Sequence, residues 1–179
     1  MQIRSIRQGF SCEHSSVNYE FVTEKKITDD IKEILKRSRE DYNISASAKK
    51  ISMHLDGEDY IDDQLQDALL QKMPLLIYED YDWWNFILMF DYDRGLFDAL
   101  KKYESEGKSE YYVSVSREGR RIQLWICVHL DYGEFHDLDE RDTFRGLRNL
   151  FLEARRNIQN GDYECIKMFH IYCKNRGGL

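Results

Sequence analysis

The chain has 179 residues, of which 42% are apolar and 13% aromatic, and Pro74 is its single proline. This aromatic content excludes a disordered chain, and the length predicts a single globular domain spanning residues 1–179. The formal net charge is −7, and residues 54–106 carry ten more acidic than basic side chains, so nucleic-acid binding through phosphates is disfavoured.

The first part of the chain is expected to alternate strands with helices. Apolar and polar residues alternate over residues 17–23, which predicts a strand. Residues 28–40 place apolar side chains at helical spacing after an N-capping threonine. A second strand is expected at 50–55 and a second helix at 59–72, which Pro74 terminates.

Two further strands are expected at residues 75–79 and 82–90. In the second of these strands, Trp84 and Phe86 point to one side while Ile87 points to the other. Both faces are therefore apolar. Such a pattern is typical of a central strand that is covered on both sides.

The second half of the chain begins with a short helix capped by Asp93. Residues 111–116 and 121–130 then read as the two strands of a hairpin, joined by a glycine-containing turn. A long helix is expected after residue 142, and the segment 160–162 both ends it and caps a last helix.

This mixed order of elements predicts an α+β fold. We expect a mixed, largely antiparallel sheet of about six strands with helices packed on one of its faces. The alternative is a three-layer α/β arrangement, which the two apolar faces of residues 82–90 would favour.

Several short segments together resemble a family of uncharacterised bacterial proteins. The segments span roughly residues 16–173 and are Tyr19-Glu20-Phe21, Arg37-Ser38, the strand around Trp84, Leu147-Arg148, and Gly161-Asp162 followed by an aromatic helix. Members of that family typically carry a single tryptophan and a glycine in the central strand, where this chain has Trp83-Trp84-Asn85. The resemblance implies one domain with a shared fold. It brings no established activity and therefore no catalytic residue.

The cysteine and histidine residues are considered next, because they would supply the ligands of a structural metal. The four cysteines are Cys12, Cys127, Cys165 and Cys173, and no two of them form a close C-x-x-C pair. Spacing of this kind predicts reduced thiols and no metal site, and no cofactor motif occurs either. The N-terminus lacks the apolar core of a secretion signal, so we expect a soluble, cytoplasmic protein.

One strand face of the hairpin is the best candidate for a binding surface. In residues 121–130 the side chains of Arg121, Gln123, Trp125 and His129 lie opposite a continuous apolar face. Arginine and rigid aromatic residues contribute strongly to protein–protein contacts. The alternative interpretation is that a helix covers this face and that Trp125 belongs to the core.

The leading functional hypothesis is a non-catalytic, cytosolic protein-interaction module with a protein partner, because no catalytic signature appears. The acidic middle of the chain would suit a basic partner. The rival is an enzyme whose site is assembled from scattered groups, with His129, His136 and nearby carboxylates as first candidates. A third hypothesis is weak nucleic-acid binding through the basic residues of the last two helices, which are Arg145, Arg148, Arg155, Arg156, Lys167, Lys174 and Arg176.

Overall fold

The computed structural model describes residues 16–38, 43–56, 60–80, 83–105, 111–129 and 140–176. Five helices lie within these ranges: α1 (Asp29–Ser38), α2 (Asp63–Leu70), α3 (Arg94–Lys101), α4 (Glu140–Gln159) and α5 (Glu164–Arg176). The strands within them are β1 (Ser16–Val22), β2 (Asn43–Ala46), β3 (Lys50–Asp56), β4 (Leu75–Asp80), β5 (Trp83–Asp91), β6 (Tyr112–Glu118) and β7 (Arg121–His129).

The described strands form one seven-stranded sheet in the order β2-β3-β1-β4-β5-β7-β6. Every neighbouring pair in this sheet is antiparallel. The six predicted strands are all present, and β2 adds a seventh strand at one edge. The α+β class and the antiparallel sheet are therefore confirmed.

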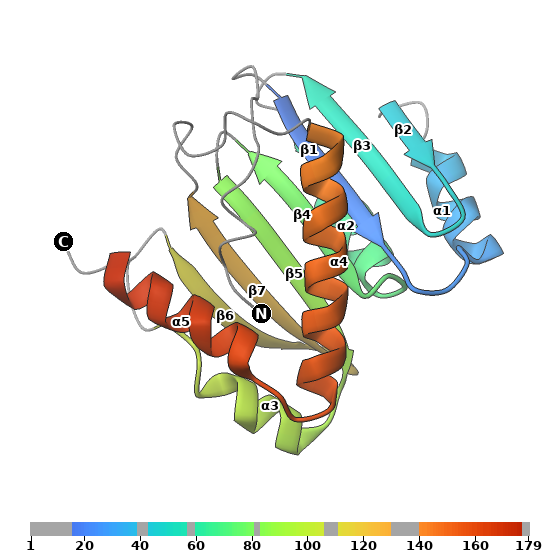
Figure 1. The fold of residues 1–179 in the computed structure, drawn as a ribbon. Coiled ribbons are helices and arrows are strands. Elements are labelled where there is room, and N and C mark those ends of the chain that lie inside the picture. The colour runs from blue at the N-terminus through green and yellow to red at the C-terminus, as the bar shows by residue number, and fades with distance from the viewer. Residues whose placement is uncertain are drawn as a thin grey trace.

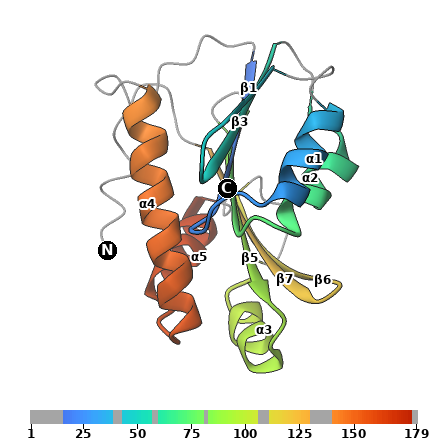
Figure 2. The same cartoon turned by 90° about the vertical axis from the view of Figure 1, so that its right-hand side faces the viewer.

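Helices cover both faces of the sheet, as Figure 1 and Figure 2 show together. In Figure 2, α4 and α5 lie on one side of the sheet, and α1 and α2 lie on the other. The expectation that helices pack on one face only was therefore wrong. The layering is that of the three-layer alternative, whereas the sheet between the layers is antiparallel.

The core consists of two apolar clusters separated by the sheet. Under α4 and α5, the rings of Phe86 and Phe151 stack with their centroids 4.0 Å apart, and Phe169 of α5 stacks on Phe151. Under α1 and α2, Leu35 and Leu69 belong to the second cluster. Alternate residues of β5 contribute to the two clusters, which explains why both of its faces are apolar.

Local sequence signals fix several ends of these elements. The side chain of Asp93 caps α3 by accepting a hydrogen bond of 2.8 Å from the backbone N–H of Leu96. Gly161, with φ at 84°, follows α4 in the left-handed conformation that ends many helices. Gly119, with φ at 62°, begins the two-residue turn between β6 and β7.

The half of the sheet that contains β2, β3 and β1 is apolar on one face only. Val17, Tyr19 and Phe21 point toward α1 and α2, where they are buried. The alternate residues Asn18 and Glu20 therefore point to the side on which α4 lies. This polar half-face beside α4 is where a cleft forms.

Candidate functional site

The predicted surface on β7 is present as one strand face. Arg121, Gln123, Trp125 and His129 alternate with core residues along the strand, and each of them is half-buried. Their separation along the strand prevents them from forming one pocket, since each second residue lies almost 7 Å further on. What each side chain contacts therefore has to be considered separately.

The two ends of this predicted set already have contacts within the protein. Arg121 Nη1 donates hydrogen bonds to the backbone oxygens of Leu70 (2.8 Å) and Gln71 (2.9 Å), at the C-terminal end of α2. Desolvation by burial lowers the pKa of Arg121 from its ordinary value. At the other end, the ring of His129 lies edge-on to Trp83, with centroids 4.9 Å apart. Arg121 thus ties α2 to β7.

The middle of β7 and its neighbour β6 form a partly open surface, called here the β6–β7 face. It consists of Tyr112, Ser114, Ser116, Gln123 and Trp125, all half-buried. Trp125 lies at the border of the cluster under α1 and α2, and its ring meets Tyr112 edge-on at 5.5 Å. The indole N–H of Trp125 donates to Asn85 Oδ1 at 2.8 Å. Trp125 is therefore neither a core residue nor a free one.

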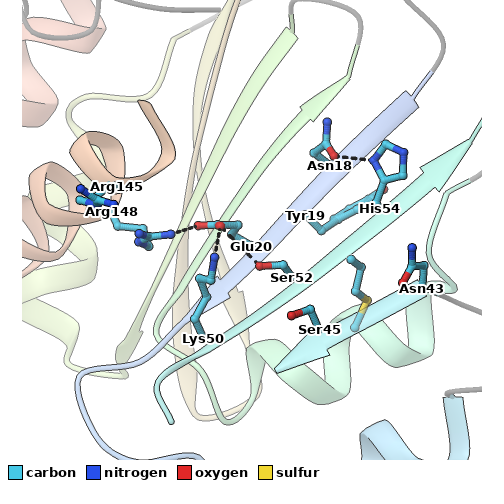
Figure 3. Close-up of a pocket in the computed structure, with 11 residues that line it drawn as sticks. Asn18, Tyr19, Glu20, Asn43, Ser45, Lys50, Ser52, His54, Arg145 and Arg148 are labelled. Carbon is cyan, nitrogen blue, oxygen red and sulfur yellow. Dashed lines mark hydrogen bonds and ion pairs between the residues drawn. The ribbon is translucent and has the colours of Figure 1, made fainter. Parts of the chain in front are cut away.

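A second candidate site is a cleft between the sheet and α4, shown in Figure 3. The cleft has a volume of about 440 Å³ and is called here the polar cleft. Its lining residues are Asn18, Tyr19, Glu20, Asn43, Ser45, Lys50, Ser52, Met53, His54, Arg145 and Arg148. Strands β1, β2 and β3 supply most of them, and α4 supplies the two arginines. Among the described residues, the lining contains three cationic side chains and one carboxylate.

Glu20 stands at the centre of this site, and its side chain is only 8% exposed. Its Oε1 atom accepts hydrogen bonds from Lys50 Nζ at 2.6 Å and from Ser52 Oγ at 3.4 Å. Its Oε2 atom accepts one from Arg148 Nη1 at 2.6 Å. A carboxylate this far removed from water is stable only when cations and donors surround it, and here two cations converge on it.

A chain of hydrogen bonds runs beside Glu20, starting from Asn18, two residues earlier on β1. Asn18 Nδ2 donates to the carboxylate of the buried Glu79 at 3.3 Å, so the Asn18 oxygen faces His54. That oxygen lies 2.7 Å from His54 Nδ1, so Nδ1 is the donor where the two form a hydrogen bond. The contact orients the exposed imidazole.

The polar cleft was not among the predicted sites. The sequence contains part of the pattern that would indicate it. Asn18 and Glu20 alternate with the apolar residues of β1, and Ser52 alternates with those of β3. Such positions usually face solvent, so the pattern alone gives no reason to expect a site. The decisive partner, Arg148, is 128 residues from Glu20 in the sequence.

The other predicted chemistries find less support in the described part of the chain. No group of three or more metal-binding side chains occurs among the residues that the structure describes. Cys127, Cys165 and Cys173 are buried free thiols, and Cys12 lies outside the described residues. For the enzyme hypothesis, His129 does not line the polar cleft, and His136 is likewise outside the described ranges.

Three of the basic residues predicted for a nucleic-acid surface are directed to different carboxylates within the protein. Arg148 reaches inward to Glu20, whereas Arg155 and Arg156 both lie within 4 Å of the Glu24 carboxylate. Arg155 also donates to the backbone oxygen of Met89. This division argues against a continuous strip that could follow a nucleic-acid backbone; the side chain of Arg176 lies outside the described part.

Comparison with known proteins gives no family for this chain. No family model matches it, and no curated protein matches it. The chain is similar to the ligand-free regulatory subunit of aspartate kinase from Thermus thermophilus, at 9% identity and a TM-score of 0.28, over 76% of this chain and 93% of that chain. Its similarity to the aspartokinase alpha and beta subunits is 13% identity and a TM-score of 0.27, over 80% and 97% of the two chains. Likenesses this weak carry no argument about function. Within the described ranges, no helix is both long and apolar enough to span a bilayer.

Proposed function

We propose that this protein is a non-catalytic protein-interaction module of the cytosol, and that it receives a basic segment of a partner protein on the β6–β7 face. The single observation that carries the proposal is the position of Trp125 and Tyr112. The two rings are half-buried and in edge-on contact on a sheet face where the core cluster under α1 and α2 ends. Aromatic residues in such positions supply large contact area at a small cost in conformational entropy.

The charges beside these rings support a basic partner. Cross-strand pairing places Asp91 and Glu118 on either side of Arg121, on the same face as Trp125. Asp80 of β4 belongs to this face as well. Arg121 itself already binds the end of α2 through two hydrogen bonds. Lysine or arginine side chains of a partner would meet both these carboxylates and the aromatic rings.

Site-specific photo-crosslinking in a native lysate tests this proposal. A photo-reactive amino acid replaces Ser114, which pairs with Trp125 across the two strands. The matched control carries the same group at Lys167, an exposed position on α5. We expect a discrete cross-linked product from position 114 only, and we expect its yield to fall as salt is added.

The variant Trp125→Ala decides whether the product depends on the β6–β7 face. In a protein with an unchanged circular dichroism spectrum, this substitution should reduce cross-linking at position 114 by about tenfold, the effect of losing a contact worth about 1.4 kcal/mol. Equal yields at positions 114 and 167, or a yield that Trp125→Ala leaves unchanged, would refute the proposal.

A further inference from the structure

In a chain of net charge −7, the polar cleft shows a surplus of positive charge among its described lining residues. Lys50, Arg145 and Arg148 line the cleft together with one carboxylate, Glu20. In a concave site with low-dielectric walls, such a surplus attracts anions more strongly than it would on an open surface.

Glu20 pairs with two of these cations and neutralises part of their charge. Lys50 and Arg148 each direct one nitrogen to a different oxygen of the buried carboxylate, both at 2.6 Å. An ammonium group has three N–H donors and a guanidinium five, so each side chain keeps further donors. Their side chains remain 33% and 21% exposed, which leaves these donors accessible from the cleft.

The remaining lining residues narrow the class of ligand. Ser45, Ser52 and Asn43 offer hydroxyl and amide groups that suit the hydroxyls of a polar ligand. The ring of Tyr19 belongs to the cluster on the opposite face of the sheet, so it provides no stacking surface in the cleft. A volume of about 440 Å³ accommodates a small metabolite.

We propose that the polar cleft binds a small phosphorylated polyol, whose phosphate contacts Lys50 and Arg148 while its hydroxyl groups contact the serine and asparagine side chains. The serine and asparagine groups of the described lining favour a sugar phosphate, and the His54 imidazole is the ring of that lining on which a nucleotide base would have to stack. This site is separate from the β6–β7 face, so either proposal can fail without the other.

Calorimetric titration of the full chain at constant ionic strength tests the site, with inorganic phosphate, glucose 6-phosphate and glucose as probes. We expect saturable binding of phosphate with a Kd on the order of millimolar, about tenfold tighter binding of glucose 6-phosphate, and no binding of glucose. No saturable binding of either phosphate compound would overturn the proposal.

Three substitutions test the assigned residues. Lys50→Gln and Arg148→Gln should each weaken glucose 6-phosphate binding about tenfold, the loss of one charge-assisted contact. Arg156→Gln is the matched control, because Arg156 lies on the same helix but outside the cleft, and it should leave the Kd unchanged. If Arg148→Gln does not fold, Lys50→Gln alone decides.

Glu20→Gln distinguishes ligand binding by Lys50 and Arg148 from a purely structural role of these two cations. The substitution keeps the shape of the side chain but removes the charge that competes with the ligand for both cations. Binding of glucose 6-phosphate should therefore tighten severalfold in Glu20→Gln. An unchanged or weaker affinity in a folded Glu20→Gln protein would show that these cations serve the fold alone.

Discussion

At the scale of single residues, Glu20 illustrates how a charge is kept inside a fold. Its neighbours on the same strand, Tyr19 and Phe21, are buried in the opposite layer, so Glu20 cannot turn away from α4. Lys50 and Arg148 compensate for its desolvation. Removing one member of such a buried cluster commonly costs about 3–5 kcal/mol, so these residues constrain the placement of α4.

The buried cysteines lead to a prediction about pH. Desolvation raises the pKa of Cys127 and Cys165 to about 12 and that of Cys173 to about 11. Unfolded thiols ionise near pH 8.5, so ionisation favours the unfolded chain above that pH. The thiol contribution to stability is therefore complete below about pH 8.5 and is lost as the pH rises toward 11–12.

Two measurements check this prediction. At pH 8 the peptides that carry Cys127, Cys165 and Cys173 should resist alkylation in the native protein and react fully in urea. The free energy of unfolding should fall between about pH 9 and 11, and it should fall less in Cys173→Val. Rapid alkylation of these cysteines in the native protein at pH 8 would contradict the assigned burial.

Single residues were only partly predictable from the sequence. Trp125 was expected either in the core or on a binding surface, and it occupies the border between the two. No local pattern distinguishes these outcomes, because they depend on where α1 and α2 end over the sheet. The pairing of Glu20 with Arg148 could not be predicted from the sequence either, because only the folded chain brings these residues together.

At the scale of elements, two glycines near the same helix should respond in opposite ways to substitution. Gly161 follows α4 with φ at 84°, and the surrounding backbone closes the helix end through a bond from Asp162 N to Asn157 O of 2.9 Å. A Cβ atom is strained in this conformation, so Gly161→Ala should reduce the free energy of unfolding by about 1 kcal/mol. Urea denaturation measures this change.

Gly146 provides the matched comparison within α4. A Cβ atom added there meets nothing within 4 Å, and alanine loses less conformational entropy in a helix than glycine does. Gly146→Ala should therefore increase the free energy of unfolding by about 0.5–1 kcal/mol. Equal signs for the two substitutions would be inconsistent with the helix end placed at Gly161.

The sequence predicted elements well where the signals were strong. Caps and turns such as Asp93 and Gly119 marked their positions correctly, because they act on neighbouring residues. The strand β2 was missed because only four residues form it and most are exposed, so no alternation of buried and exposed side chains appears. It exists because β3 pairs with it, which is a long-range cause.

At the scale of the whole molecule, the number of layers depends on information that a single element does not carry. The two apolar faces of β5 indicated that helices cover both sides of the sheet, and this indication was correct. The general expectation for an antiparallel sheet, one covered face and one exposed face, favoured the wrong layering. In β1 and β3 that expectation does hold, because one face is apolar and the other is polar. The two halves of the sheet therefore differ in whether one face or both faces are apolar.

This architecture predicts that the chain unfolds as one cooperative unit. Phe86 lies in the cluster under α4 and α5, and Leu69 lies in the cluster under α1 and α2. Both clusters rest on the same strands, with β5 contributing to each, so neither can lose its packing without exposing the other side of the sheet. Phe86→Ala and Leu69→Ala should each lower the free energy of unfolding by about 3–5 kcal/mol.

Urea unfolding followed by tryptophan fluorescence and by far-ultraviolet circular dichroism tests this cooperativity. We expect one transition in each variant, with coincident midpoints for the two probes, and both substitutions should shift the entire curve. Ile171→Ala, at a side chain 48% exposed on α5, is the control and should shift it by less than about 0.5 kcal/mol. If Leu69→Ala displaced only part of the signal, the layer formed by α1 and α2 would unfold separately, and the prediction of a single domain would be wrong.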